Sequence, residues 1–305
     1  HLDPRNPCPV STFADIVNKT LCTCPRQNAP ASSQNSRRFD SVFSRFRQRR
    51  VERTRPNVAG EPARVPAGER IYAVGDIHGR GDLLRVLDDA IAADMRRRPP
   101  GGSVTVVHLG DYIDRGPDTR GVVGTLITPR PGPVQRVFLM GNHDRWLRQW
   151  LETGLLQPAW LQSGADATLE SYGITDFPPP GDEAAWTALR QRLLRRMPPG
   201  HRRFFNQLQL MHRHGDYLFA HAGIRPGVPL RQQQPVDLMF IREPFLSEAG
   251  DLGVVVVHGH TVTEEPVVRG NRIGVDTGAW RTGRLTALVL EDDRFDFIAT
   301  GEAND

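Results

Sequence analysis

The feature that most constrains this chain is a series of short apolar runs, each of which ends abruptly in a loop rich in glycine, acidic residues or histidine. The clearest case is the loop 110–116, G-D-Y-I-D-R-G, which directly follows the apolar run 104–109. Glycine and aspartate favour turns, so a strand over the apolar run has to end there. The loop places two carboxylates and a cation close together, those of Asp111, Asp114 and Arg115. Taken alone, such a loop is more often an ordinary surface turn than a site.

Four other loops of the same kind occur, and the set of five contains half of the ten histidines of the chain. A single histidine at the end of a strand is usually a hydrogen-bonded structural residue, whereas five such strand ends predict one shared site. Aspartate, histidine and asparagine without cysteine are ligands that suit Mn, Fe or Zn. Their number exceeds the need of one tetrahedral ion, which predicts two metal ions that share a bridging carboxylate. The other loops are 75–79 (G-D-I-H-G), 141–144 (G-N-H-D), 221–223 (H-A-G) and 258–260 (H-G-H).

The pattern between these loops predicts an α/β fold. Apolar residues at helical spacing in 82–98 and 118–127 separate the first three predicted strands, and this βαβαβ order favours a parallel inner sheet with ligands at the carboxyl ends of its strands. A helical, aromatic-rich insertion is expected at about 144–210. The last three predicted strands lack helices between them, which predicts antiparallel hairpins in a second sheet. The predicted strands are 70–75, 103–109, 135–140, 216–220, 254–257, 272–275, 285–290 and 295–298.

Residues 1–66 are typical of a flexible tail, and 67–300 are predicted to form the catalytic domain. The tail is rich in proline and polar residues, and its segment 36–55 has eight arginines against two acidic residues. An amphipathic helix is predicted around 39–46. It could contact an acidic partner or a membrane surface, but a helix docked on its own domain or a disordered segment is the favoured interpretation.

The composition restricts the cellular compartment and the binding partners that we expect for this protein. The three cysteines lie within the first 24 residues and are too few for a four-ligand zinc site, which indicates a reducing compartment. No apolar run approaches the ~20 residues of a membrane-spanning helix, and no secretory signal is recognisable, so a cytoplasmic location is expected. Only one of the 39 basic residues is lysine. This ratio is more typical of codon bias than of recognition, so no specific nucleic-acid partner is expected.

The motifs D-x-H-G, G-D-x-x-D-R-G, G-N-H-D, H-A-G and G-H-T together resemble those of the PPP family of phosphoprotein phosphatases, most closely its bacterial branch, within the calcineurin-like metallophosphoesterases. The resemblance covers about 70–290. It implies a two-sheet β-sandwich flanked by helices, with a dinuclear metal centre at one edge. The sequence departs from eukaryotic members at Asp144, where they have glutamate, and at Ala222, where they have glycine. The G-H-T match favours His260 over His258 as a metal ligand.

The same resemblance implies a role for each residue of the site. The catalytic set comprises a general acid, His143, the acid that orients it, Asp114, and two phosphate-binding arginines, Arg115 and Arg242. The assignment of Arg242 rests on its position between the motifs. The implied metal ligands are Asp76 and His78 for the first ion, Asp111 as the bridging carboxylate, and Asn142, His221 and His260 for the second ion.

The expected activity is that of a metal-dependent protein phosphatase acting on phosphoserine, phosphothreonine or phosphotyrosine. Two divalent ions, expected to be Mn with Fe or Zn as alternatives, would activate a bridging hydroxide for in-line attack on phosphorus. A symmetrical dinucleoside polyphosphate hydrolase is the alternative; the pair Asp114–Arg115 favours the phosphatase, because those hydrolases often lack the acid. A nucleic-acid or membrane-surface binding protein acting through the basic tail is a third hypothesis. The sequence indicates neither the substrate nor the oligomeric state.

Overall fold

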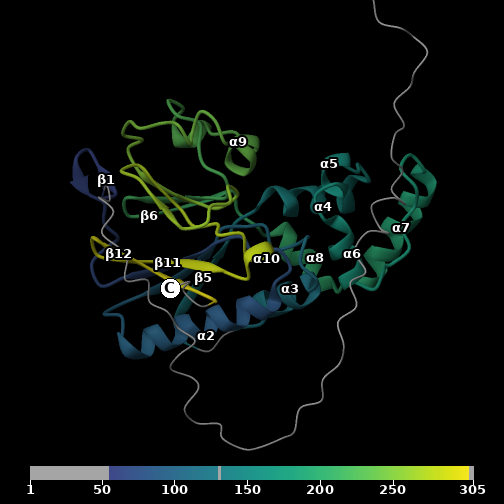
Figure 1. The fold of residues 1–305 in the computed structure, drawn as a ribbon, viewed down its shortest axis with the longest axis horizontal. Coiled ribbons are helices and arrows are strands. Elements are labelled where there is room, and N and C mark those ends of the chain that lie inside the picture. The colour runs from purple at the N-terminus through teal and green to yellow at the C-terminus, as the bar shows by residue number, and fades with distance from the viewer. Residues whose placement is uncertain (1–54, 130–131, 302–305) are drawn as a thin grey trace, which may run out of the picture. The chain divides into compact units, whose positions relative to one another are not determined.

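Two five-stranded β-sheets stack face to face, with helices on both outer faces (Figure 1). This architecture is that of a computed structural model, which describes residues 55–129 and 132–301. These residues belong to one of the two compact units of the chain, Asp40–Asp305. The predicted amphipathic helix around 39–46 and the three cysteines lie outside the described residues. The two-sheet α/β sandwich predicted from the sequence is confirmed.

The first sheet has the strand order β12-β11-β3-β4-β5. Its strands β3, β4 and β5 are parallel, as the βαβαβ pattern predicts, and β11 runs antiparallel to both β3 and β12. Val74 at the end of β3 pairs with His108 at the end of β4, so the loops that follow leave the sheet next to each other. The strands are β3 (Arg70–Val74), β4 (Val104–His108), β5 (Val134–Phe138), β11 (Thr286–Glu291) and β12 (Arg294–Ala299).

The second sheet has the order β6-β7-β8-β10-β9, in which β7, β8 and β10 are parallel and the two edge strands are antiparallel. His221 follows β7 and Asp111 follows β4, and their side chains lie 3.5 Å apart. The parallel strands of both sheets therefore end at the same edge of the sandwich. The strands are β6 (Met211–His214), β7 (Tyr217–Ala220), β8 (Val255–His258), β9 (Val267–Val268) and β10 (Arg272–Gly274), and a separate hairpin joins β1 (Asn57–Val58) to β2 (Glu61–Pro62).

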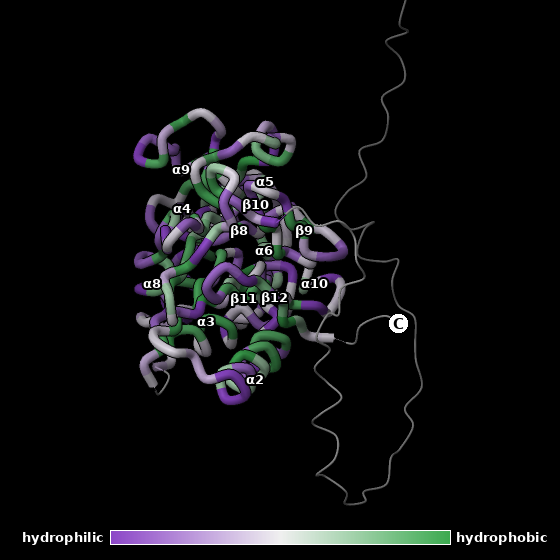
Figure 2. The backbone as a smooth tube through the Cα atoms, turned by 90° about the vertical axis from the view of Figure 1, so that its left-hand side faces the viewer, coloured by the Kyte–Doolittle hydropathy of each residue, from purple (hydrophilic) through white to green (hydrophobic). Residues whose placement is uncertain are grey.

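Helices cover both outer faces of the sandwich (Figure 1). In Figure 2, α2 carries both hydrophilic and hydrophobic turns, as expected of a helix with one face on a sheet. Among the described residues, no helix has the length and apolar character needed to cross a membrane. The helices are α2 (Gly81–Arg97), α3 (Thr119–Ile127), α9 (Pro235–Phe240), the short α10 (Ala279–Thr282) and η1 (Leu230–Gln232), and, in the predicted insertion, α4 (Asn142–Thr153), α5 (Pro158–Leu161), α6 (Ala165–Ser171), α7 (Glu183–Arg196) and α8 (Pro199–Asn206).

The core is built by the alternation of side chains along each strand. In β3, Ile71 and Ala73 pack in the cluster between the two sheets, whereas Tyr72 and Val74 pack in the cluster with the helices on the outer face. In β8, Val256 packs with the residues of α9 beyond the second sheet. Because both faces of these strands are covered, their sequences are continuous apolar runs, which is why they were predictable.

The last strands of the chain differ from the sequence prediction. The hairpin predicted over 285–298 forms as β11 and β12, but it pairs with β3 and so extends the first sheet. Only β10 of these three strands lies in the second sheet, where it runs parallel to β8. An apolar pattern shows that a strand is buried without showing which sheet it joins. Strand β6 (M-H-R-H) was not predicted, because it is an edge strand of mostly polar residues.

The folded body begins before residue 67, so the predicted boundary of the tail needs correction. The β1–β2 hairpin lies within the segment assigned to the tail. Ala63 and Val65 are buried in the core between the sheets, and the backbone N–H of Arg64 donates to the carboxylate of Asp216. Prolines are tolerated in edge strands, so Pro56, Pro62 and Pro66 are compatible with this part of the folded body.

Asp94 is a buried carboxylate that ties α2 to β3. It accepts hydrogen bonds from the Tyr72 hydroxyl at 2.9 Å and from the Arg98 guanidinium at 2.8 Å, and the Arg70 guanidinium lies 3.7 Å away. Asp94→Ala is expected to lower the free energy of unfolding by ~3–5 kcal/mol, because buried Arg70 and Tyr72 lose a partner. Urea denaturation measures the change. The matched control is Asp89→Ala at an exposed position of the same helix, for which a change within about 0.5 kcal/mol is expected.

Candidate metal centre

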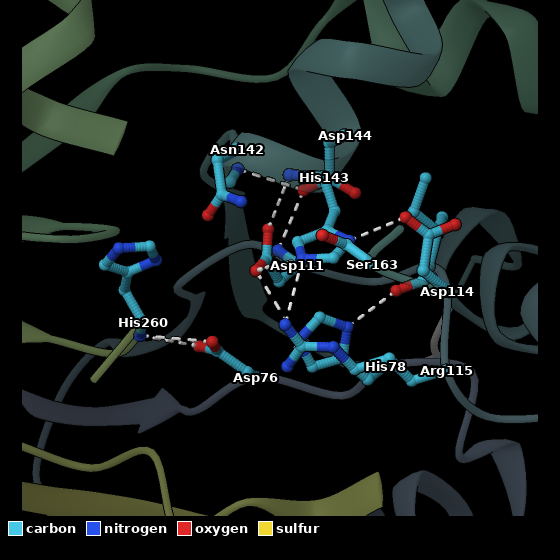
Figure 3. A network of polar contacts seen from close by, with 12 residues as sticks. Asp76, His78, Asp111, Asp114, Arg115, Asn142, His143, Asp144, Ser163 and His260 are labelled. Carbon is cyan, nitrogen blue, oxygen red and sulfur yellow. Dashed lines mark hydrogen bonds and ion pairs between the residues drawn. The ribbon is translucent and has the colours of Figure 1, made fainter. Parts of the chain in front are cut away.

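The six predicted metal ligands converge at the edge of the sandwich where the parallel strands end. Figure 3 labels five of them, all except His221. Among the described residues, two groups of side chains could hold a metal ion, and Asp111 belongs to both. One group adds His78 and His143, the other adds His221 and His260, and within each group the ligand atoms lie within 4.8 Å of one another. The six ligands follow the strands in order: Asp76 and His78 after β3, Asp111 after β4, Asn142 after β5, His221 after β7 and His260 after β8.

Asp111 lies between the two groups. Its Oδ2 is 3.5 Å from Nε2 of His78 and 3.5 Å from Nε2 of His221. Burial acts to raise the pKa of Asp111, but the surrounding imidazoles, His221 foremost, outweigh burial and lower it. A carboxylate that stays ionised between two sets of imidazole nitrogens has the charge and the position of a bridging ligand.

The histidines present the nitrogen that a metal would need. Nδ1 of His78 donates to the carbonyl of Ile113 at 2.7 Å, and Nδ1 of His221 donates to the carbonyl of Leu109 at 3.0 Å. Each backbone contact orients the ring and leaves Nε2 as the ligand atom. Nε2 of His260 is buried with no hydrogen-bond partner among the described residues. An orphaned buried nitrogen at this position fits a metal ion.

Burial also keeps these rings in the form that binds metals. It lowers the pKa of His221, lowers that of His78 well below the usual value, and lowers that of His260 to about 3. Neutral imidazole is the ligand form of histidine. Nε2 of His221 lies 3.0 Å from Oδ1 of Asn142, so the predicted amide ligand faces the same space. The donor set of nitrogen and oxygen atoms therefore fits divalent Mn, Fe or Zn.

Asp76 has a carboxylate neighbour that sequence reasoning missed, Asp276. Both are 2% exposed, and the two carboxylates interact electrostatically. Burial, followed by the charges of Asp276 and Asp111, raises the pKa of Asp76 well above its usual value, and burial raises that of Asp276 to about 6. Buried carboxylates this close need a compensating positive charge, which bound cations would supply. Asp276 directly follows the predicted strand 272–275, so the rule that found the other loops could have found it.

We expect Asp276→Asn to weaken metal binding by ~10–100-fold, because the residue beside a metal ligand orients that ligand and tunes its charge. Isothermal titration of the metal-free protein with Mn²⁺ measures the change. Asp89→Asn, at an exposed position of α2, is the matched control and should leave the affinity unchanged. An unchanged affinity in Asp276→Asn would show that Asp276 does not support the centre.

His143 and Asp114 form a buried pair beside the metal ligands. Nδ1 of His143 lies 2.6 Å from Oδ2 of Asp114, which is fully buried. Burial acts to lower the pKa of His143, but Asp111 and Asp114 outweigh it and raise that pKa. Asp114 is held in turn by the insertion: the Trp160 indole N–H donates to it at 2.7 Å and the Thr168 hydroxyl at 2.6 Å. The sequence predicts only that the insertion is helical and aromatic-rich, and the tertiary structure reveals this role of Trp160 and Thr168.

Asp144, the departure from the eukaryotic pattern, holds two site loops together. Its carboxylate accepts hydrogen bonds from the backbone N–H groups of Gly141 at 2.9 Å, Asp111 at 2.8 Å and Tyr112 at 3.2 Å. The loops approach so closely that a Cβ on Gly141 would lie 2.0 Å from a carboxylate oxygen of Asp111, so only glycine fits there. Aspartate at this position therefore acts as a clamp between the loops that follow β4 and β5.

The two predicted phosphate-binding arginines both lie at the site. The guanidinium nitrogens of Arg115 are 3.0 Å from Nε2 of His78 and 3.2 Å from Nε2 of His143. Arg242 is exposed, and its charge contributes to lowering the pKa of both His221 and His260. Guanidinium groups such as these could hold the oxygens of a phosphate by bidentate hydrogen bonds.

Backbone strain is concentrated at this edge of the sandwich. Among the described residues, seven other than glycine have a positive φ, and five of them belong to the site. Such conformations persist only where the surrounding structure imposes them, and they cluster at functional sites. The five are His78, Asp111, Asp114, Arg115 and His260.

His258, the other histidine of the H-G-H loop, was the alternative to His260 as a metal ligand. Its side chain contacts Gly259 and Phe245. Its Nδ1 lies 3.1 Å from the carbonyl oxygen of Gly259, and its ring packs edge-on against Phe245 with centroids 5.2 Å apart. Neither group of possible metal-holding residues in the described part of the chain includes it. The geometry therefore agrees with the choice of His260.

Overlapping sets of nitrogen and oxygen ligands beside arginines that suit a phosphate are what a metal-dependent phosphoesterase requires. The sequence profile of the calcineurin-like phosphoesterases matches residues 69–301. The chain therefore belongs to this family, whose members use a dinuclear centre of divalent metals.

Similar proteins carry two different activities in their names. The asymmetrical bis(5'-nucleosyl)-tetraphosphatase PrpE of Anoxybacillus flavithermus is 26% identical over 237 residues, which cover 70% of this chain and 88% of that protein. Serine/threonine-protein phosphatase 1 of Salmonella typhimurium is 25% identical over 226 residues, 72% of this chain and 92% of that protein. The crystal structure of a candidate diadenosine tetraphosphatase shares the fold, with a TM-score of 0.51 and 20% identity over 82% of this chain and 99% of that chain.

Proposed function

We propose that this protein is a metal-dependent phosphomonoesterase of the bacterial PPP type that removes phosphate from phosphoserine, phosphothreonine or phosphotyrosine in proteins. The observation that carries the proposal is the buried pair of His143 and Asp114, with 2.6 Å between Nδ1 and Oδ2. Its Nε2 lies 3.2 Å from the guanidinium of Arg115, the group assigned to phosphate. The second ring nitrogen of the pair therefore lies beside the group to which we assign phosphate binding.

The chemistry of the leaving group explains why a site with the His143–Asp114 pair favours a phosphate monoester as its substrate. The alkoxide of serine or threonine is a strong base and needs a proton as it departs, and a positioned acid is worth ~10²–10⁴-fold in rate. A polyphosphate departs as a stable anion and needs no such proton. Asp114 raises the basicity of His143 and holds its ring, so Nε2 can keep a proton for an alkoxide.

The metal ligands complete the proposal. Two divalent ions, Mn in our proposal, would supply Lewis acidity and an activated water nucleophile when bound. Arg115 and Arg242 would bind the phosphate oxygens, and the buried Asp111 would keep its charge to hold the ions. The residues that would hold the ions are Asp76, His78, Asp111, Asn142, His221 and His260.

A second candidate is a dinucleoside polyphosphate hydrolase. The tetraphosphatase relative favours this candidate. Its sequence identity to this chain is 26%, against 25% for the phosphatase relative, and the two alignments cover 70% and 72% of this chain. The hypothesis of a binding protein acting through the basic tail stays a prediction, because that segment lies outside the described residues.

A panel of metals and substrates separates the candidates. Mn²⁺, Fe²⁺, Zn²⁺ and Mg²⁺ are each combined with phosphoserine, phosphothreonine and phosphotyrosine peptides, p-nitrophenyl phosphate and diadenosine tetraphosphate. The proposal predicts that kcat/KM is highest with Mn²⁺ and a phosphopeptide. A higher kcat/KM for diadenosine tetraphosphate than for every phosphopeptide would overturn it and establish the second candidate.

A further inference from the structure

A cavity of about 750 Å³ opens beside Arg115 and is not used by the chemistry described above. Its lining includes the loop before α6, α6 itself and Trp280 of α10. The position of α6 relative to the site is fixed, because the backbone N–H of Arg115 donates to the carbonyl of Gly164 at 3.1 Å. Arg115, which contacts His78 and His143 (Figure 3), also lines this cavity, so the cavity lies next to the position that we assign to the phosphate.

The α6 wall is negatively charged. Asp166 and Glu170 are exposed, line the cavity and stand four residues apart on the same face of the helix. Like charges at this spacing destabilise a helix slightly. Within residues 55–129 and 132–301, neither carboxylate forms an ion pair that would offset this repulsion. The wall therefore has a net negative charge that is open to a ligand.

Trp280 gives the cavity an aromatic surface. It is 38% exposed, a large hydrophobic side chain left open to solvent. The guanidinium of Arg115 lies 5.2 Å from the centre of its ring, so the indole already contacts one cation that lines the cavity. An aromatic face next to two carboxylates attracts a further cation by both charge and cation–π contact.

We propose that this cavity binds the segment of a phosphopeptide next to the phosphorylated residue and selects an arginine or lysine there. The inference rests on the proposed phosphatase function. A guanidinium or ammonium group fits between Asp166, Glu170 and the ring of Trp280, whereas the polyphosphate chain of a dinucleotide would be repelled by the two carboxylates. The same charges would disfavour peptides with acidic residues next to the phosphorylated residue.

The test uses the full chain with Mn²⁺ and two phosphoserine peptides of equal length, one with arginines and one with glutamates on both sides of the phosphoserine. Exposed ion pairs and cation–π contacts are individually weak, so we expect a preference of roughly 5–10-fold in kcat/KM for the basic peptide. In the double variant Asp166→Asn/Glu170→Gln this preference should fall to about twofold or less. The hydrolysis of p-nitrophenyl phosphate should stay unchanged, because its nitrophenyl group has no positive charge for the two carboxylates to bind. Glu183→Gln, an exposed acid on α7, is the matched control.

A second measurement separates failure of this inference from failure of the proposed function. Peptides with a non-hydrolysable phosphonate in place of the phosphoserine phosphate are used to inhibit p-nitrophenyl phosphate hydrolysis. Stronger inhibition by the basic peptide, lost in the double variant and weakened in Trp280→Ala, supports the cavity even if phosphopeptides are poor substrates. Efficient hydrolysis of both phosphopeptides with no charge preference overturns the cavity inference and leaves the phosphatase intact. Tighter binding of diadenosine tetraphosphate than of the basic peptide, dependent on Trp280, also overturns it, because the cavity would then be a nucleotide site.

Discussion

Asp111→Asn is expected to lower kcat/KM for p-nitrophenyl phosphate by ~10³-fold or more, since metal-ion catalysis contributes several kcal/mol to such reactions. The asparagine amide has nearly the same shape but no charge, and it cannot replace a carboxylate whose Oδ2 lies 3.5 Å from Nε2 of both His78 and His221. The purified variant should also retain less metal than the wild type. Activity assays in Mn²⁺ and elemental analysis of the desalted protein measure the two effects.

The outcome for Asp111→Asn has to be distinguished from unfolding. Thermal denaturation without metal should show a stable variant, because the substitution removes a buried charge and adds no bulk. Asp89→Asn, an exposed carboxylate on α2, is the control for the loss of one negative charge. If Asp111→Asn keeps its metal and its activity within tenfold of the wild type, Asp111 is not the shared ligand.

His143→Asn is expected to slow hydrolysis of a phosphoserine peptide by ~10²–10⁴-fold, because the departing alkoxide loses its proton donor. Loss of activity on p-nitrophenyl phosphate should be much smaller, since nitrophenolate leaves without a proton. The ratio of kcat values on the two substrates is the measurement, and it does not depend on enzyme concentration. An equal loss on both substrates would rule out the general-acid role.

Metal content is determined in the same His143→Asn preparation, because His143 also belongs to one of the groups that could hold an ion. A variant that keeps its metal but loses only the phosphopeptide activity separates proton donation from metal binding. Thr168→Ser, which keeps the hydroxyl that donates to Asp114, is the conservative comparison. It should keep most of the activity on both substrates.

Much of the site could be predicted because its residues follow strands with strong apolar patterns. Asp76, Asp111 and His221 each come directly after a buried run, and parallel strands carry such residues to one edge. Asp276 obeys the same rule but was missed, because its loop has no histidine and only one acid. The strand pattern failed for β11 and β12, whose residues are buried in either sheet, so only their pairing with β3 decides their place.

The contacts that the helical insertion makes with the site could not be predicted from the sequence. Trp160 and Thr168 have no local pattern that distinguishes them from core residues, and their contacts with Asp114 join positions 46 and 54 residues apart. Trp280 faces Arg115 across an even longer stretch of chain. Such contacts depend on how helices pack on the sandwich, and packing is set by the shapes of many side chains together.

The sequence by itself determined the chemistry: which carboxylates and imidazoles stand at strand ends, and therefore that divalent metals and a phosphate are handled there. This was possible because strand period and loop composition are local properties of the chain. Only the tertiary structure decided that Asp276 is a neighbour of Asp76, that Asp114 is held by the insertion, and that an acidic, aromatic cavity opens beside Arg115. Those features arise where distant segments meet, and no local pattern records which surfaces will come into contact.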